Sequence, residues 1–184
     1  MKKIVIIGTS SSGKTTLGKY ISNKMNIPHK ELDEFYWEAN WTGAEASVFR
    51  NRVDEFTKNE TWVVDGNFGQ IRDLLWKKAN TIIWLDYPIH IILKQFLRRS
   101  IIRSIKKEKL WNNNTETFRN NIFSSNSLLI WIFKTYRSNK QEFAELMKSN
   151  KYSHLKFIRL EHPNETEQFL KTFVGLDVIP NILS

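Results

Sequence analysis

A glycine-rich loop that directly follows an apolar segment constrains the fold of this chain more than any other feature. Residues 8–15 read GTSSSGKT and match the pattern G-x-x-x-x-G-K-[ST]. The preceding residues, KIVII, are almost entirely apolar and rich in β-branched side chains, as expected of a strand covered on both faces of a sheet. A helix is expected over residues 14–25. The pattern therefore predicts a buried strand, a phosphate-binding loop and a helix in succession.

The chemistry of this loop follows from its small residues and from the helix behind it. Glycine and serine let the backbone curl so that its N–H groups face phosphate oxygens, and the helix dipole adds positive potential there. Lys14 would reach the β- and γ-phosphates of ATP, and the Thr15 hydroxyl would bind Mg²⁺. A plain Gly/Ser turn before a helix is the weaker interpretation. We expect nucleotide binding by Gly8, Thr9, Ser10, Ser11, Ser12, Gly13, Lys14, Thr15 and Thr16.

Strands and helices are expected to alternate along the rest of the chain. The expected strands are residues 3–7, 26–33, 61–65, 81–86 and 155–160. The expected helices cover residues 14–25, 44–58, a segment after Pro88, and 164–173, where Asn164 and Glu167 are spaced as a capping pair. This alternation predicts an α/β fold, a five-stranded parallel sheet flanked by helices. Residues 104–150 interrupt the alternation and are expected to form a helical lid insertion within a single domain, residues 1–184.

The composition excludes several kinds of chemistry. The 184 residues include no cysteine, which rules out disulfides, thiolate zinc sites and cysteine nucleophiles and agrees with a reducing cytoplasm. The apolar runs are too short, or too often interrupted by polar residues, to span a bilayer. We therefore expect a soluble, cytoplasmic protein without a membrane partner. The net charge of +9 favours polyanionic partners such as nucleotides or nucleic acid.

Much of the positive charge lies in one segment, which carries Lys94, Arg98, Arg99, Arg103, Lys106, Lys107 and Lys109 against the single acid Glu108. Arg99 and Arg103 are spaced i, i+4 and would share one face of a helix. Two guanidinium groups there could close over a phosphoryl group during transfer and stabilise its charge. A solvated basic helix face is an equally weighted alternative.

Two aspartates stand where strands of the expected sheet end, and ligands bind at the carboxyl edge of such sheets. Asp33 could orient an acceptor hydroxyl or hold a Mg²⁺-bound water there, and its alternative role is a cap or turn residue. Asp65 precedes Gly66, which allows close approach of the backbone, and Asn67, which offers an amide. Asp86, shortly before Pro88, is expected to cap the next helix instead.

Aromatic residues follow Asp33 in close succession. Phe35, Tyr36, Trp37 and Trp41 could stack on a planar acceptor, or they could form core beneath the second helix. Because three consecutive side chains cannot all point inward from a strand or helix, at least one is expected to face a ligand or partner.

The remaining sequence separates the classes of protein that carry such loops. A GTPase would add a D-x-x-G switch, which this chain lacks, and its closest match to an N-K-x-D loop, NKQE, follows a helical segment and not a strand. Neither WVVD nor IWLD ends in the adjacent acids of large motor ATPases. A small kinase, with a donor site, an acceptor site and a lid, remains.

The chain resembles the adenylate-kinase-like P-loop proteins called DNA topology modulation proteins, and more distantly adenylate and shikimate kinases. Five segments carry the resemblance, in this order along the chain: GTSSSGKTTL, LDEFYW, WVVDGNF, NTIIWLDYP and LRRSIIR. The resemblance covers roughly residues 1–175. It implies a P-loop fold of nucleoside-monophosphate-kinase type, with ATP on the loop and a lid between the fourth and fifth strands. Adenylate kinases continue the D-G element with a proline and a phosphate-contacting arginine, whereas this chain reads DGNFGQIR. This displacement of Arg72 argues against AMP as the acceptor.

Two functional hypotheses follow. The first is an ATP-dependent kinase that uses Mg²⁺ and transfers the γ-phosphoryl group to a small acceptor, such as a nucleotide or nucleoside. Its expected catalytic residues are Lys14, Asp33, Asp65, Arg99 and Arg103, and its expected metal-binding residues are Thr15 and, directly or through water, Asp33. The second is an ATP-binding, nucleic-acid-associated protein that affects DNA topology and phosphorylates no small molecule. The identity of the acceptor and the choice between ATP and GTP stay open at this stage.

Overall fold

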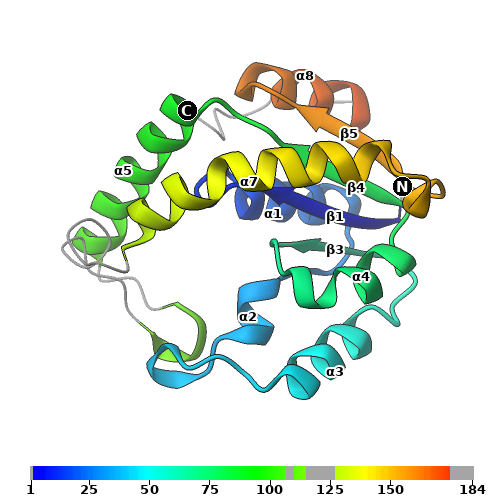
Figure 1. Cartoon of the computed structure of the whole chain (residues 1–184), viewed down its shortest axis with the longest axis horizontal. Coiled ribbons are helices and arrows are strands. Elements are labelled where there is room, and N and C mark those ends of the chain that lie inside the picture. Colours follow the sequence, from blue (N-terminus) through cyan, green and yellow to red (C-terminus); the bar gives the residue numbers. More distant parts are fainter. Residues whose placement is uncertain (1, 107–109, 115–126, 175–184) are drawn as a thin grey trace.

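The computed structural model describes residues 2–106, 110–114 and 127–174 (Figure 1). Five strands form one sheet in the order β2-β3-β1-β4-β5. Every neighbouring pair is parallel. The strands are β1 (Lys3–Gly8), β2 (His29–Glu31), β3 (Trp62–Asp65), β4 (Thr81–Leu85) and β5 (Lys156–Leu160). The expected five-stranded parallel α/β fold is confirmed.

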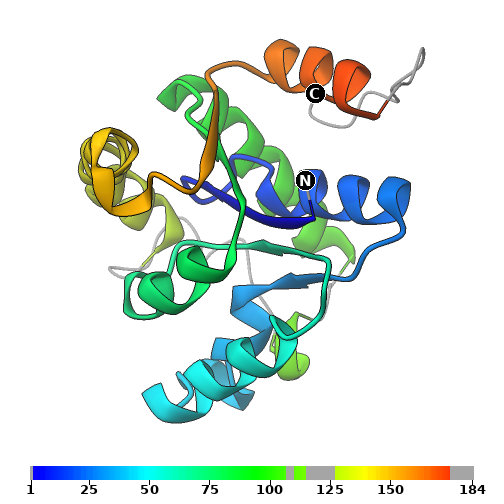
Figure 2. The ribbon, with the colours of Figure 1, turned by 90° about the vertical axis from the view of Figure 1, so that its right-hand side faces the viewer.

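The connections between the strands contain helices. The α-helices are α1 (Lys14–Met25), α2 (Leu32–Tyr36), α3 (Ala46–Phe56), α4 (Arg72–Lys78), α5 (Ile89–Lys106), α7 (Leu128–Lys148) and α8 (Pro163–Val174). Short 3-10 helices are η1 (Ala39–Trp41), η2 (Gly69–Ile71), η3 (Trp111–Asn113) and η4 (Asn150–Tyr152). Figure 2 shows α4 and α7 on one side of the sheet and α1 on the other.

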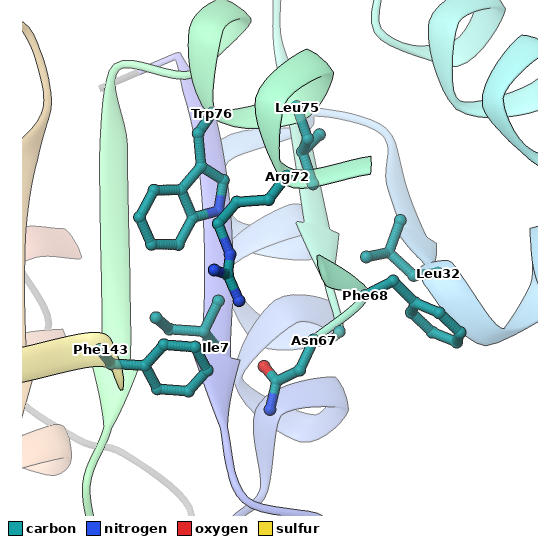
Figure 3. Close-up of a pocket in the computed structure, with 9 residues that line it drawn as sticks. Ile7, Leu32, Asn67, Phe68, Arg72, Leu75, Trp76 and Phe143 are labelled. Atoms are coloured by element: carbon teal, nitrogen blue, oxygen red, sulfur yellow. The ribbon is translucent and has the colours of Figure 1, made fainter. Parts of the chain in front are cut away.

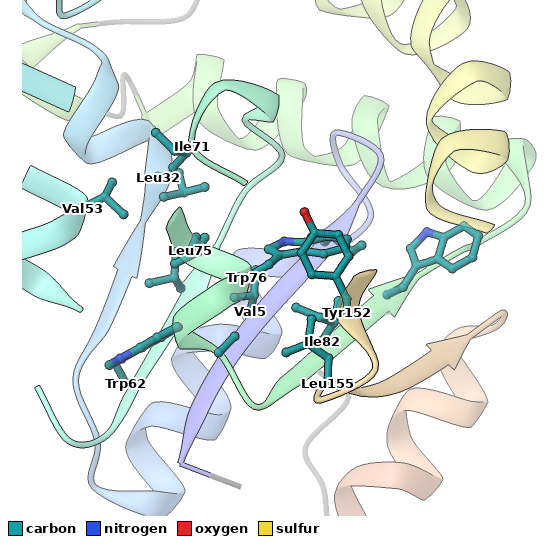
Figure 4. Packing of buried hydrophobic residues seen from close by; sticks show 14 of the residues in the cluster. Val5, Leu32, Val53, Trp62, Ile71, Leu75, Trp76, Ile82, Tyr152 and Leu155 are labelled. Carbon is teal, nitrogen blue, oxygen red and sulfur yellow. The ribbon is translucent and has the colours of Figure 1, made fainter. Parts of the chain in front are cut away.

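Alternate side chains of β1 supply two hydrophobic cores, one on each face of the sheet. Val5 and Ile7 belong to the core shared with α3, α4 and the end of α7, part of which is drawn in Figure 4. Ile4 and Ile6 belong to the core shared with α1, α5 and α8. These four side chains are at most 2% exposed, and full burial of such a side chain contributes about 1.5–3 kcal/mol. The central strand therefore fixes the position of the loop that follows it.

Helix α7 contributes to both cores. Ile132, near its start, packs in the core with α1 and α5, whereas Phe143, towards its end, packs against Trp84 in the other core. The Ser127 side chain caps the helix by accepting a hydrogen bond from the Ile130 N–H at 3.3 Å. Within the expected insertion at residues 104–150, α7 is the longest element that the structure describes, and residues 107–109 and 115–126 lie outside the described residues.

Local structure differs from expectation at several points. Asp33 does not end a strand, because β2 stops at Glu31 and a capping box formed by Glu31 and Glu34 starts α2. Helix α4 was not expected. Helix α8 begins at Pro163, so Asn164 lies within the helix and is not its N-cap.

Within the described residues, no helix combines the length and apolar character needed to cross a membrane.

Candidate nucleotide and acceptor site

The loop between β1 and α1 has the backbone conformation that its glycines predict. Gly8 has a φ of 150° and Gly13 a φ of 91°, both in the range that favours glycine. A Cβ atom on Gly8 would lie 2.6 Å from the Leu85 carbonyl oxygen. Gly13 is the N-cap of α1, so the loop ends at the positive end of the helix dipole.

Two serine hydroxyls are buried in this loop. Ser11 Oγ and Ser12 Oγ have no hydrogen-bond partner among the described residues. A buried hydroxyl without a partner costs about 1–3 kcal/mol, so an acceptor atom bound in the loop would relieve that cost. Phosphate oxygens are such acceptors, and the loop therefore fits a phosphate group. Of the other residues expected to bind nucleotide, Thr9 is buried and Thr16 is exposed.

Asn67 holds the first residue of the loop. The Gly8 N–H donates to Asn67 Oδ1 at 3.1 Å, and Asn67 Nδ2 donates to the Gly8 carbonyl oxygen at 2.5 Å. Both ends of the amide are therefore bonded to the loop backbone. The role of Asn67 is to position the loop from the adjacent strand end.

Lys14 lies among charges of both signs. Its Nζ donates to the Thr9 carbonyl oxygen at 2.9 Å. Burial lowers the pKa of Lys14, the carboxylates of Asp65, Asp33 and Glu31 act in the opposite direction, and Arg99 lowers it further. Arg99, on α5, is thus one of the charges that act on the pKa of Lys14. These groups form one electrostatic cluster.

The Thr15 hydroxyl faces two carboxylates. Thr15 Oγ1 donates to Asp65 Oδ2 at 2.8 Å, and Glu31 Oε2 lies 3.2 Å from Thr15 Oγ1. The other carboxylate oxygen of Asp65 accepts a hydrogen bond from His29 Nε2 at 2.7 Å. The side chains of His29 and Asp65 are 8% and 4% exposed, so this chain of contacts is largely shielded from water.

The oxygen atoms around Thr15 suit a hard cation. Among the described residues, no group of three or more His, Cys, Asp or Glu side chains could hold a metal by itself. Mg²⁺ does not need such a group, since it commonly takes one or two protein ligands, several waters and substrate phosphates. A hydroxyl beside two carboxylates, next to a phosphate loop, fits that coordination.

Asp33 lies in the first turn of α2 and belongs to the same cluster. Its Oδ1 accepts a hydrogen bond from the Trp37 indole at 2.9 Å. Burial raises the pKa of Asp33 to about 6; the Trp37 hydrogen bond and the Lys14 charge lower it, and the neighbouring carboxylates raise it. A carboxylate with this pKa is ionised at neutral pH and can still accept a proton.

The two expected lid arginines share one face of α5. Arg99 and Arg103 are half-buried and both interact within the protein, whereas Arg98 is exposed. Of this pair, Arg99 lowers the pKa of Lys14, which connects α5 electrostatically with the phosphate loop.

Asp86, expected to cap a helix, forms ion pairs with Arg159 and Lys140 instead. It lies at the carboxyl end of β4 and is 5% exposed. Arg159 donates to its Oδ2 from Nε at 2.9 Å and from an Nη at 2.5 Å, and Lys140 Nζ lies 3.1 Å away. These contacts link the ends of β4 and β5 to α7.

Aromatic residues after Asp33 pack against the insertion. The rings of Trp37 and Trp41 are 5.5 Å apart, and those of Trp41 and Trp111 are 6.2 Å apart. The side chain of Asn114 accepts from the Trp41 N–H at 3.0 Å and donates to the Glu38 carbonyl oxygen at 2.8 Å. The described part of the insertion is therefore attached to the aromatic loop, and its Trp111 is half-buried.

A small pocket, partly open to solvent and with room for about one water molecule, lies at the carboxyl edge of the sheet, on the face opposite α1 (Figure 3). Its lining comes from residues that neighbour the site along the chain and from α4 and α7: Ile7, Leu32, Gly66, Asn67, Phe68, Arg72, Leu75, Trp76 and Phe143. The guanidinium group of Arg72 points towards Ile7 and Asn67 in this view.

The sequence of the chain was compared with family models and with curated proteins. No family model matches the chain. The shikimate kinase of Staphylococcus epidermidis is 29% identical over 122 residues, 58% of this chain and 71% of that protein. The uncharacterized protein YqaC of Bacillus subtilis is 29% identical over 55% of this chain, and the dephospho-CoA kinase of Prochlorococcus marinus is 30% identical over 51%.

Solved structures agree with this result at the level of the fold. A shikimate kinase from Acinetobacter baumannii in complex with shikimate superposes with a TM-score of 0.57 at 14% identity, and the match covers 97% of this chain and 96% of that chain. A gluconokinase from Sinorhizobium meliloti gives a TM-score of 0.52 at 13% identity, covering 95% and 94%. The fold is that of shikimate kinases. The expected enzyme class, an ATP-dependent kinase, is confirmed by the curated relatives. The finer resemblance to DNA topology modulation proteins stays a prediction.

Three residues of the site escaped the sequence analysis. Glu31 stands two residues before Asp33, and only the register of β2 shows that it faces Thr15. His29 is an isolated histidine, and its partner Asp65 is 36 residues away. Arg72 was noticed only as a displaced residue, because the short helix that carries it was not expected.

Proposed function

We propose that this protein is an ATP-dependent kinase that transfers the γ-phosphoryl group of ATP to a hydroxyl group of a small acceptor. One observation carries the proposal. At the end of the central strand, the phosphate loop holds Lys14 and two buried serine hydroxyls that have no hydrogen-bond partner among the described residues, beside a cluster of three carboxylates. Such a loop binds phosphates, and the carboxylates provide what metal binding and proton transfer need.

The loop would bind the phosphates of ATP. The hydroxyls of Ser11 and Ser12 and the N-terminus of α1 supply donors and positive potential. Lys14 exchanges its contact with the Thr9 carbonyl oxygen for phosphate oxygens and neutralises charge that shifts to the leaving ADP.

Thr15, Asp65 and Glu31 would hold Mg²⁺, with the carboxylates contacting its water ligands. The bound ion supplies charge neutralisation for the β- and γ-phosphates. Asp65 keeps Thr15 oriented, and the buried His29 keeps Asp65 oriented. Among the described residues, Asp33 bonds to Trp37 and makes no hydrogen bond to Thr15, and we assign it to the acceptor rather than to the metal.

Asp33 would serve as the base for the acceptor. In the reaction the acceptor oxygen forms a bond to the γ-phosphorus, the bond to the β,γ-bridging oxygen breaks, and the hydroxyl proton passes to the Asp33 carboxylate. The pKa of about 6 suits this step near neutral pH. Arg99, and with lid closure Arg103, would stabilise charge on the phosphoryl group during transfer.

The acceptor would be a small alcohol. The relatives named for their acceptors act on shikimate and on dephospho-CoA, which makes these two the first candidates. A nucleotide or nucleoside, expected from the sequence, is the next.

Transfer of label from γ-labelled Mg·ATP to a panel of acceptors tests this function. The panel contains shikimate, gluconate, dephospho-CoA, AMP and adenosine, and the variants are Lys14→Ala and Lys77→Ala. Lys77 is exposed on α4 and serves as a matched control for the loss of a lysine. We expect acceptor-dependent transfer that falls by about 10²–10³ in Lys14→Ala and stays unchanged in Lys77→Ala. ATP binding without transfer to any acceptor would argue against the kinase.

The nucleic-acid hypothesis has one supporting observation, the exposed basic side chains of Lys94, Arg98 and Lys106 on α5. It predicts DNA binding that decreases steeply with salt. A filter-binding titration at 50 and 200 mM salt distinguishes the two functions, since a dedicated small-molecule kinase should retain no measurable DNA affinity at the higher concentration.

A further inference from the structure

We propose that the outward face of α5 binds the surface of an anionic lipid bilayer. Helix α5 runs along one side of the molecule (Figure 1). Its outward face consists of exposed aliphatic and basic side chains, which are Lys94, Leu97, Arg98, Ile101, Ile102 and Ile105. The inference goes beyond the kinase proposal and does not depend on it.

The spacing of the aliphatic residues separates them from the core. The side of α5 that packs inward is marked by its buried residues, which are Ile92, Phe96 and Ser100. Leu97, Ile101 and Ile105 are also spaced by four residues and so form a second row, rotated away from the first. Ile105 is 76% exposed, and Leu97, Ile101 and Ile102 are 39–47% exposed. A surface helix normally presents polar residues there, and a continuous exposed apolar row marks an interaction site.

The same face is positively charged. Lys94 and Arg98 are exposed, and each stands three residues before a member of the aliphatic row, Leu97 or Ile101. The sequence of α5, IHIILKQFLRRSIIRSIK, contains no aspartate or glutamate that could neutralise them. The partner of this face therefore has to accept apolar side chains and to carry negative charge.

An anionic bilayer surface offers both properties at the same depth. Aliphatic side chains of a helix that lies flat enter the boundary between headgroups and acyl chains. The long side chains of Lys94 and Arg98 extend from the same face to the lipid phosphates. The expectation of no membrane partner considers only segments that cross a bilayer, whereas a helix face in the headgroup region needs no such segment.

Two other partners match the face less well. Phosphates of a nucleic acid pair with Lys94 and Arg98, but they leave Ile101 and Ile105 without an apolar partner, and aliphatic side chains offer bases no ring for stacking. A symmetric contact between two copies of the chain would bury the aliphatic rows, but it would also bring like charges together, with no acid on α5 to compensate. Charge and apolar character together thus favour the bilayer.

Co-sedimentation of the full chain with lipid vesicles tests the inference without requiring turnover. Vesicles that combine phosphatidylglycerol with phosphatidylcholine are compared with vesicles of phosphatidylcholine alone, at low and at physiological ionic strength. We expect binding to the anionic vesicles that decreases with salt, and binding to the neutral vesicles that is weaker by about 10-fold or more.

Two matched pairs of variants separate the contributions of charge and of apolar contact. Arg98→Gln should weaken binding to anionic vesicles about 5-fold, whereas Lys77→Gln, which removes an exposed charge from α4, should have no effect. Ile105→Ser should weaken binding about 10-fold, whereas Val48→Ser, at an exposed apolar position of α3, should not. Because all four positions are exposed, the variants should keep the Tm of the wild type.

The absence of cysteine from the chain allows a direct measurement of insertion. Ile105→Cys and Val48→Cys each provide one thiol for a polarity-sensitive fluorophore. On anionic vesicles, emission from position 105 should shift to shorter wavelength, and emission from position 48 should stay unchanged.

Several results would overturn the inference. They are no binding to anionic vesicles at low ionic strength, equal binding to neutral vesicles, and unchanged emission from position 105. Self-association that Ile105→Ser abolishes, without vesicle binding, would assign the face to a second copy of the chain. DNA binding that Arg98→Gln weakens, without vesicle binding, would assign it to nucleic acid. Vesicle binding and phosphoryl transfer are measured separately, so the failure of one proposal leaves the other intact.

Discussion

Gly18 lacks a side chain where His29 packs against α1. A Cβ atom at position 18 would lie 2.5 Å from His29 Nε2, the atom that bonds to Asp65. Gly18→Ala should therefore displace the imidazole and loosen Asp65 and Thr15. We expect a loss of about 1–3 kcal/mol in the free energy of unfolding and a several-fold higher Mg²⁺ concentration for half-maximal activity.

Thermal melts and Mg²⁺ titrations of the transfer reaction measure both effects. Gly69→Ala is the matched control, because a Cβ atom there meets nothing within 4 Å. Wild-type Mg²⁺ dependence in Gly18→Ala, together with lowered stability, would leave the histidine with a packing role only.

Asp33 should set the lower limb of the pH profile of kcat. Its pKa is raised to about 6, mainly by burial, so the base is protonated and inactive below that pH and ionised above it. The Trp37 indole stabilises the carboxylate and lowers the pKa. Trp37→Phe should therefore move the limb to higher pH, while Asp33→Asn removes most activity at every pH. An unmoved limb in Trp37→Phe would assign the titration to another group.

At the scale of elements, Asn114 joins η3 to the aromatic loop around η1. Its side chain is 5% exposed and bonds to the backbone of both Glu38 and Trp41. Asn114→Ala leaves these backbone groups without their partner, at a cost of about 1–3 kcal/mol. Hydrogen exchange of residues 37–43 should become faster, and the KM of the acceptor should rise more than that of ATP. Asn112→Ala, which loses one exposed contact to Trp37, should have a smaller effect.

The sequence reveals elements to the extent that their residues repeat a pattern. The strands β1 and β4 are continuous apolar runs, and the glycine loop locates α1 to the residue. Helix α4 has only seven residues, too few for a recognisable apolar period, and so Arg72 was not assigned to a helix. Glu31 and Glu34 form the capping box that starts α2, so Asp33 lies in the first turn of a helix and not at the end of a strand.

The contacts of the site depend on strand order, which local sequence does not encode. Asp65 reaches Thr15 because β3 lies directly beside β1, with Ile6 opposite Asp65. The residue types of the site could therefore be predicted, but the pairing of His29, Asp65 and Thr15 could not.

At the scale of the whole molecule, the loop lies between two cores that share one sheet. Loop residues are continuous with β1, which contributes to both cores, and with α1, which packs in one of them. A ligand that binds the folded loop and not the unfolded chain stabilises the whole molecule by mass action. Mg·ATP at a concentration of 100 times its Kd should add about 2.7 kcal/mol. For a chain of this size, this corresponds to a rise of roughly 5–10 °C in Tm.

Calorimetric melts with and without Mg·ATP measure this rise. Lys14→Ala should keep the Tm of the free protein within a few degrees and lose most of the nucleotide-dependent rise, because the lysine supplies charge at the phosphate loop and belongs to neither hydrophobic core. Lys77→Ala should behave as wild type in both conditions. An equal rise in Lys14→Ala would place nucleotide binding outside the loop and would remove the basis of the kinase proposal, since the proposed reaction puts the γ-phosphate beside the bonded pair Thr15 and Asp65.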